Sequence, residues 1–399
     1  MSINGRIAAL TEAQTLGMAQ RVRELRAAGK KVISLLLGEP DFPVPVPLQE
    51  AAIAAIREGH APYPPVAGIP SLREAIAAYY HRRYGLPYQG SQVVVSNGSK
   101  QAIYNVLLAL LEPGEEVIVP APYWVSYLPL IQLAEARPII LPTTVETDYK
   151  LLPHQLEAAI TPATRALILC SPSNPTGTAY TPTELHALAE VLEKHPQIWV
   201  ISDEIYELIR YEGEAFSPAQ LPALYERTVI CNGFSKAFAM PGWRLGYLLA
   251  PQPLAEAATK VQGQTTAGAN IIAQKAALAG LTGDLESLVA PMIEAFRARR
   301  DALYTYLQAH LPETRPYLPA GAFYYFLDIS AFLDRETPSG QRLTTADDVA
   351  EYLLQEGVAV VSGSAFGSDR HIRLSYAVAL PEIEAGVQLL TQALRALQD

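Results

Sequence analysis

Lys236 and Arg244 stand in an apolar stretch of the sequence, residues 231–247, which contains no Asp or Glu to pair with either cation. Apolar surroundings favour the neutral form of an amine, and a neutral amine can form an imine with an aldehyde. A guanidinium offers a planar fork of N–H donors that suits a phosphate or a carboxylate. The stretch therefore predicts that both cations serve a bound ligand.

Residues that can hydrogen-bond, stack or ionise also follow the other β-rich runs of the central sequence. Ligands of open α/β sheets bind beyond the carboxyl ends of the strands. Five successive runs ending in such residues predict a single shared site. In chain order these residues are Ser99 and Lys100, then Trp124, then Asn174, then Asp203 and Tyr206, and finally Ser235 and Lys236.

One group of these residues suits a phosphate. Ser99 and Lys100 open a predicted helix after Asn97-Gly98, where free backbone N–H groups favour an anion. Arg244 supplies a fork of donors for the same anion, and Ser235 adds a hydroxyl.

The other group suits an aromatic aldehyde. Asp203 can hold a proton on a ring nitrogen, while Asn174 and Tyr206 can hydrogen-bond a phenolic oxygen. Trp124 can stack on the ring face, and Lys236 can form an imine with the aldehyde. Phosphate, ring nitrogen, phenolic oxygen and aldehyde together describe pyridoxal 5′-phosphate (PLP).

The elements that must position these residues lie between about residues 90 and 250. Short runs that are apolar on both faces alternate there with helical stretches, which indicates a mostly parallel sheet covered on both sides. The last run follows its predecessor too soon for a crossover helix, so we expect it to be antiparallel. The class is α/β, with a mostly parallel seven-stranded sheet. The runs are 92–96, 116–120, 138–141, 166–170, 198–202, 228–231 and 244–250.

A different pattern begins near residue 290 and predicts a smaller α+β layer that packs with an N-terminal helix. The expected helices are 11–29, 292–311, 347–356 and 382–397, and the expected strands are 323–328, 358–361 and 371–375. We expect residues 1–45 to form an N-terminal arm and part of the small domain, 46–290 the large α/β domain, and 291–399 the C-terminal small domain.

Composition excludes several classes of protein. The formal charge of −10 disfavours general binding of nucleic acid, which needs clustered Lys and Arg. No apolar run is long enough to cross a membrane, and the polar start of the sequence resembles no secretory signal. The two cysteines each end an apolar run, so buried free thiols of a cytoplasmic protein are expected. The histidines show no metal-ligand spacing, so no metal is expected.

Several motifs carry a resemblance that spans residue 5 to the C-terminus. The sequence resembles the class I, fold-type-I PLP-dependent aminotransferases, most of all bacterial aspartate aminotransferases with Lys in the Gly-Ser-Lys-Gln position. The motifs are Gly38-Glu-Pro-Asp-Phe, Tyr63-Pro-Pro-Val-Ala-Gly-Ile-Pro, Ser171-Pro-Ser-Asn-Pro-Thr-Gly, Ser202-Asp-Glu-Ile-Tyr, Ser235-Lys-Ala-Phe-Ala-Met-Pro-Gly-Trp-Arg-Leu-Gly and Arg373-Leu-Ser-Tyr.

The resemblance implies a role for each matching position. Lys236 is the Schiff-base lysine and then the base that moves the proton. Arg373 binds the substrate α-carboxylate, and Gly38 lines the substrate pocket with its backbone. A homodimer is implied, because Tyr63 reaches the phosphate from a second subunit. The remaining implied contacts are Asp203 with the pyridinium, Asn174 and Tyr206 with the ring oxygen, Trp124 with the ring face, and Ser99, Lys100, Ser235 and Arg244 with the phosphate.

The reaction and substrate leave alternatives open. Lys100 can also meet a distal carboxylate, which favours aspartate or glutamate with 2-oxoglutarate or oxaloacetate. Ala13, however, stands where the closest relatives have a serine, although Thr15 is kept. An aromatic or prephenate aminotransferase and a PLP-dependent C–S β-lyase remain alternatives.

Two competitors from other classes fit less well. A nicotinamide-dependent dehydrogenase is disfavoured because no Gly-x-Gly-x-x-Gly follows a strand. A PLP-binding transcription regulator is disfavoured because no basic helix-turn-helix segment is attached.

Overall fold

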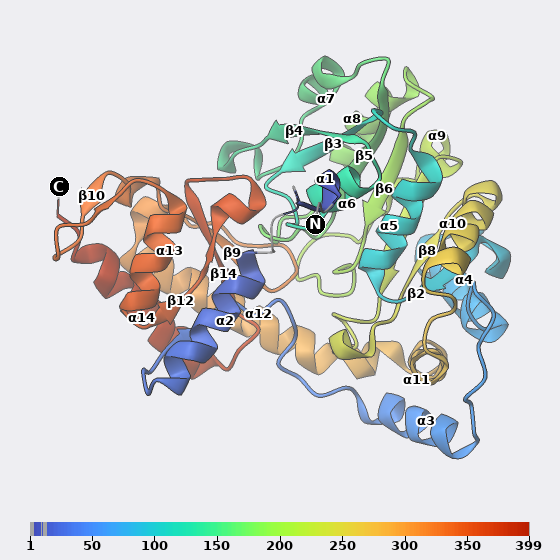
Figure 1. Ribbon diagram of the computed structural model, residues 1–399, viewed down its shortest axis with the longest axis horizontal. Coiled ribbons are helices and arrows are strands. Elements are labelled where there is room, and N and C mark those ends of the chain that lie inside the picture. Colours follow the sequence, from blue (N-terminus) through green and yellow to red (C-terminus); the bar gives the residue numbers. More distant parts are fainter. Residues whose placement is uncertain (1–3, 9, 11–13, 399) are drawn as a thin grey trace.

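The fold is built around a twisted central sheet with helices on both faces (Figure 1). The structure, a computed structural model, describes residues 4–8, 10 and 14–398. Within these residues the sheet has seven strands in the order β2-β8-β7-β6-β5-β3-β4. The strands are β2 (Val93–Ser96), β3 (Glu116–Ala121), β4 (Arg137–Pro142), β5 (Thr164–Cys170), β6 (Trp199–Asp203), β7 (Thr228–Gly233) and β8 (Gly246–Leu249).

The predicted strand directions are confirmed. Strands β3 to β7 pair in parallel, whereas β8 is antiparallel to both β2 and β7. Only twelve residues separate β7 from β8, which is too short for a helical crossover back to the same edge.

The interior strands are apolar on both faces because both faces are covered. In β5, Ala166 and Ile168 pack into the core on one side of the sheet, and Leu167 and Leu169 pack into the core on the other. This alternation follows from the two-residue period of a strand.

Three groups of helices cover the sheet (Figure 1). One face carries α5 (Ser99–Leu110), α6 (Tyr127–Leu133) and α10 (Gln252–Thr265). The other face carries α7 (Pro153–Ala159), α8 (Pro182–Glu193) and α9 (Pro222–Tyr225). Near β2 it also carries α4 (Pro70–Tyr84), against which α11 (Ile271–Thr282) packs, and α3 (Val46–Arg57) packs on α11.

The C-terminal third forms a smaller α+β layer with the N-terminal segment, as expected. A three-stranded antiparallel sheet has the order β13-β14-β9 among the described residues, and β1 pairs in parallel with β12. The elements are α2 (Gln14–Ala27), β1 (Ile33–Ser34), α12 (Leu285–His310), β9 (Tyr324–Asp328), α13 (Ala346–Gln355), β12 (Val358–Ala359), β13 (Val361–Ser362), β14 (His371–Ser375) and α14 (Leu380–Arg395).

Two sequence-based expectations are wrong in detail. Helix α12 begins at Leu285, before Pro291, because Asp284 caps it through Ser287 N and buried Val289 anchors its first turns. The run 358–361 is not one strand. It divides between β12 and β13, whose partners are β1 and β14.

Candidate active site

One cleft of about 630 Å³ lies beyond the carboxyl ends of the central strands and brings the predicted site residues together. Its wall is completed by β14 and by the segment that follows β1. The cleft is lined by Gly38, Ser99, Lys100, Trp124, Asn174, Asp203, Tyr206, Ser235, Lys236, Arg244 and Arg373, among others.

Three positions named in the sequence analysis are not placed in this cleft. Tyr63 is 94% exposed and does not line the cleft of its own chain. Ala13 and the side chain of Thr15 lie outside the part of the chain that the structure describes.

Lys236 follows the end of β7 and is half-buried. Its Nζ donates a hydrogen bond to the backbone oxygen of Gly38. Burial lowers the pKa of Lys236 to about 8, with the nearby guanidiniums of Arg373 and Arg244 acting in the same direction and Glu39 opposing them. About a tenth of this amine is therefore neutral and nucleophilic at pH 7, far more than for an ordinary exposed lysine.

Asp203 is the last residue of β6 and is buried. Its Oδ2 accepts a hydrogen bond of 2.6 Å from the hydroxyl of Tyr127, and its Oδ1 accepts one of 3.3 Å from Ile205 N. Burial raises the pKa of Asp203 to about 6, while these hydrogen bonds hold it down. Sequence reasoning missed Tyr127, although it begins α6 only three residues after the predicted site residue Trp124.

Arg373 is a buried cation that lines the cleft from β14. Its Nη1 donates to Asn174 Oδ1 at 3.1 Å, and its Nη2 donates to Leu36 O at 2.9 Å. Its Nε is buried and has no hydrogen-bond partner among the described residues, and no ion pair with a described carboxylate is present. A buried, incompletely satisfied guanidinium is costly unless an anion binds to it.

Tyr324 is a second residue that sequence reasoning missed. Its ring centroid lies 4.4 Å from the Arg373 guanidinium carbon, and its hydroxyl lies 2.9 Å from that of Tyr206. The run 323–328 was recognised only as a strand, because nothing local in the sequence distinguishes Tyr324 from Tyr325.

The N-terminus of α5 forms an anion cradle. Ser99 is its first residue, and the buried Ser99 Oγ has no partner within the described residues. Arg244 lies over this helix start, with its Nη2 3.4 Å from Asn97 O. Gly98 has φ +89°, and a Cβ there would lie 2.4 Å from Arg244 Nη2. Free helix N–H groups, an unpartnered hydroxyl and a guanidinium together suit a phosphate.

Lys100 and Ser235 border the same cradle. Lys100 Nζ lies 5.1 Å from the ring centroid of Trp124. Burial, together with the nearby Arg244 charge, lowers the pKa of Lys100. Ser235 is buried beside Lys236.

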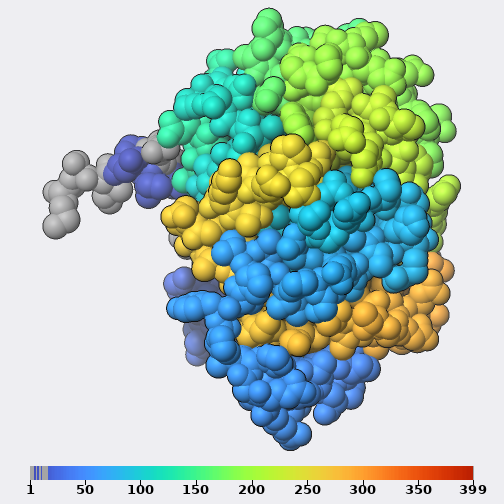
Figure 2. All heavy atoms as spheres, turned by 90° about the vertical axis from the view of Figure 1, so that its right-hand side faces the viewer, coloured from blue at the N-terminus to red at the C-terminus, as the bar shows by residue number. Residues whose placement is uncertain are grey.

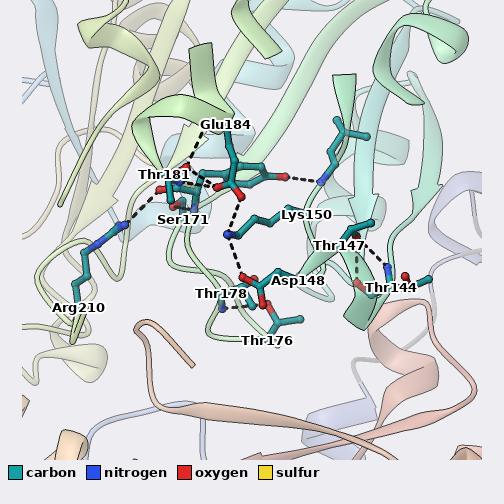
Figure 3. Close-up of polar contacts among 12 residues, drawn as sticks. Thr144, Thr147, Asp148, Lys150, Ser171, Thr176, Thr178, Thr181, Glu184 and Arg210 are labelled. Atoms are coloured by element: carbon teal, nitrogen blue, oxygen red, sulfur yellow. Dashed lines mark hydrogen bonds and ion pairs between the residues drawn. The ribbon is translucent and has the colours of Figure 1, made fainter. Parts of the chain in front are cut away.

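The loop that carries Asn174 is held by a polar network on its outer side (Figure 3). Buried Lys150 forms ion pairs of 3.0 Å with both Asp148 and Glu184. Glu184 also closes the N-terminus of α8 through Thr181. Arg210 donates to the backbone oxygen at the end of the loop, at Tyr180. The bond from Arg210 fixes the end of this loop, and the other contacts fix the start of α8 that follows it.

Among the described residues, no group of three or more His, Cys, Asp or Glu side chains is arranged to hold a metal ion. Both cysteines are free. Cys231 is buried as expected, but Cys170 is only half-buried because its strand ends at the cleft.

No single helix among the described residues has the length and apolar character needed to cross a membrane. The pair α11 and α12 meets the criterion only jointly and is bent by 93°.

Comparison with known proteins places this architecture in a family. The family model of aminotransferase class I and II matches residues 30–390. The aspartate/prephenate aminotransferase of Cereibacter sphaeroides is 47% identical over 94% of each chain. A bifunctional aspartate aminotransferase and glutamate/aspartate-prephenate aminotransferase of Petunia hybrida is 44% identical over 99% of this chain and 83% of its own.

Solved structures agree with this assignment. The aspartate aminotransferase of Rhizobium meliloti superposes with a TM-score of 0.95 at 38% identity over all of both chains. That of Thermus thermophilus with maleate gives 0.92 at 38% identity over 98% of this chain and all of its own. The chain belongs to the class I and II aminotransferases and has their fold-type-I architecture.

Proposed function

We propose that the cleft binds PLP and that the protein transfers an amino group from aspartate or glutamate to 2-oxoglutarate or oxaloacetate. The observation that carries this proposal is the convergence in one cleft of the anion cradle at α5, the buried carboxylate of Asp203 and the partly neutral amine of Lys236.

The residues fit the cofactor at each end. The unpartnered Ser99 Oγ, the start of α5 and Arg244 would hold the phosphate, assisted by Lys100 and Ser235. A side chain at position 98 would prevent Arg244 from lying so close to the start of α5. Glycine at this position therefore keeps the backbone N–H groups and the guanidinium together for an anion.

When bound, PLP supplies an electron sink that stabilises negative charge at the substrate Cα. Trp124 would contact the ring face. Asp203 would hold a proton on the ring nitrogen, and Tyr206 and Asn174 would hydrogen-bond the ring oxygen. Lys236 would hold the cofactor through its amine and carry the proton that leaves the substrate Cα.

Arg373 would bind the α-carboxylate of the substrate. A carboxylate would accept a hydrogen bond from its unpartnered Nε and would balance its positive charge. Lys100 offers a second cation for a distal carboxylate, and relatives named aspartate aminotransferases support this substrate class. A second candidate acceptor is prephenate, which appears in the names of several relatives.

A homodimer would complete the site by contributing Tyr63 to the phosphate of the partner subunit. Exposed apolar side chains support this proposal: Val46 is 66% and Ile56 61% exposed on α3. Segments α3 and α4 occupy much of the face shown in Figure 2, and α1 (Gly5–Ala8) projects from the body there.

We assign residues 46–290 to the large PLP-binding domain and residues 291–399, with part of 1–45, to a small domain that closes over the substrate. The cleft supports this division because its wall combines the central strand ends with β14 and residues near 38.

The proposal is tested first by the visible absorption spectrum of the purified protein. We expect a cofactor band in the wild type, a changed band in Lys236→Ala, and the wild-type band in the control Lys260→Ala, which alters an exposed lysine. The absence of a band in every variant after incubation with PLP contradicts the proposal.

A panel of amino donors with 2-oxoglutarate then identifies the reaction. We expect turnover with aspartate. Faster release of ammonia and pyruvate from cystathionine than formation of oxaloacetate from aspartate would instead identify a β-lyase. A Lys100→Ala variant that loses aspartate and alanine turnover equally removes the role of Lys100 in distal recognition.

A further inference from the structure

Helix α2 carries three arginines, and within the part of the chain that the structure describes, Arg21 and Arg26 have partners while Arg23 has none. Arg21 forms an ion pair with Glu351, including a bond of 2.7 Å from Nη2 to Oε1. Arg26 donates two hydrogen bonds, of 3.2 and 2.8 Å, to Val32 O. Arg23 has no hydrogen-bond or ion-pair partner among the described residues, and it lines the cleft.

Arg23 belongs to the wall of the cleft that also holds Arg373. Ala19 lies one helical turn before Arg23, so both are on the same face of α2, and both line the cleft. Ala19 packs in the same apolar cluster as Leu36. The backbone oxygen of Leu36 accepts the bond from Arg373 Nη2.

Two other cations of the cleft, Arg244 and Lys100, lie at the anion cradle formed by the start of α5. Arg244 lies over the start of α5, and Lys100 lies over Trp124, close enough to Arg244 for their charges to interact. Both therefore stand at the phosphate end. An arginine that only meets solvent is common, but this one borders a cleft whose substrates are anions, where its charge attracts a carboxylate.

We propose that Arg23 binds the distal carboxylate of a dicarboxylic substrate while Arg373 holds the α-carboxylate. Arg23 is then a specificity-determining residue, and Lys100, which borders the same cleft, would assist it from the phosphate end. This inference rests on the proposed aminotransferase function and deepens it, because it assigns substrate selection to the N-terminal helix.

The test compares Arg23→Gln with Arg21→Gln in the PLP-loaded protein. Both substitutions remove one positive charge from α2, but Arg21 points to Glu351 and does not line the cleft. The measured quantity is the ratio of kcat/KM for aspartate to kcat/KM for alanine, which share the α-carboxylate. For Arg23→Gln we expect this ratio to fall about tenfold, equivalent to about 1.4 kcal/mol. We expect this lower ratio to come mainly from a higher KM for aspartate. For Arg23→Lys we expect the ratio to fall less.

A binding measurement provides a readout independent of turnover. Isothermal titration of the loaded protein compares succinate, with two carboxylates, with propionate, with one. Arg23→Gln should weaken succinate binding by about tenfold more than propionate binding, and Arg21→Gln should not.

The outcomes separate this inference from the proposed function. If the wild type prefers aspartate and Arg23→Gln retains that preference, the role of Arg23 is overturned alone. An equal change for aspartate and alanine, or the same change in Arg21→Gln, also overturns it. If the wild type transaminates without preferring aspartate over alanine, the dicarboxylate assignment itself fails.

Discussion

Glu204, the neighbour of Asp203, allows a quantitative prediction about stability. Its carboxyl group is buried, and its Oε1 accepts hydrogen bonds of 2.8 Å from Ser202 Oγ and 2.6 Å from Ser217 Oγ. Burial raises the pKa of Glu204 to about 8, helped by the negative charges of Glu207 and Asp203 and opposed by the serine hydroxyls. Near neutral pH the folded protein therefore keeps this carboxyl protonated, whereas the unfolded chain ionises it.

The direction of the pH dependence follows from proton binding. Because the pKa is raised on folding from 4.5 to about 8, the folded state binds more protons than the unfolded state between these values. Stability then falls as pH rises through this window. One unit of pKa difference corresponds to about 1.4 kcal/mol. The cost to folding is therefore about 1 kcal/mol at pH 5 and about 4 kcal/mol at pH 8.

Glu204→Gln should remove this cost, since glutamine cannot ionise and its Oε1 can still accept from both serines. We expect the free energy of unfolding of the variant, relative to wild type, to rise by about 3 kcal/mol from pH 5 to pH 8. Urea denaturation at one fixed protein concentration measures it. Glu190→Gln is the matched control, because Glu190 is exposed on α8. A difference between Glu204→Gln and wild type that does not grow with pH refutes the reasoning.

Three further predictions concern the cleft. Tyr127→Phe removes the hydroxyl whose hydrogen bond lowers the pKa of Asp203. The pKa of Asp203 should therefore rise above about 6. The acidic limb of the kcat/KM profile should then move to higher pH, and an unmoved limb contradicts the role of Tyr127. Gly98→Ala should weaken PLP affinity at least about tenfold in a cofactor titration, because its Cβ would meet Arg244 at 2.4 Å and the backbone has φ +89°; unchanged affinity would show that the cradle is not used. Arg373→Gln should lower kcat/KM about 100-fold for every α-amino acid tested while the visible spectrum is retained, and a loss confined to dicarboxylic donors would assign Arg373 a different role.

The chemistry of the site was largely readable from the sequence. Each strand is a short apolar run, and the residue after it must lie at a sheet edge, so the positions of Asn174, Asp203 and Lys236 relative to one another follow from local patterns. The short link between residues 231 and 246 similarly required β8 to be antiparallel.

Contacts between distant segments were not readable in this way. The bond from Tyr127 to Asp203 joins residues 76 positions apart, and Tyr324 reaches Tyr206 across 118 positions. A hydroxyl has no local preference that identifies its partner. The division of the run 358–361 likewise depends on two separate partner strands.

The sequence by itself determined the fold class, the order of the strands along the chain and the set of groups that suit PLP, because these depend on residue type and short-range spacing. Only the tertiary structure decided which side chains complete the site. Among the described residues it gives Arg23, in the cleft wall, no partner. Arg21 and Arg26, two and three positions away on the same helix, are bonded to Glu351 and to Val32. Helical geometry directs these three arginines to different neighbours, and those neighbours come from residues far away in the chain.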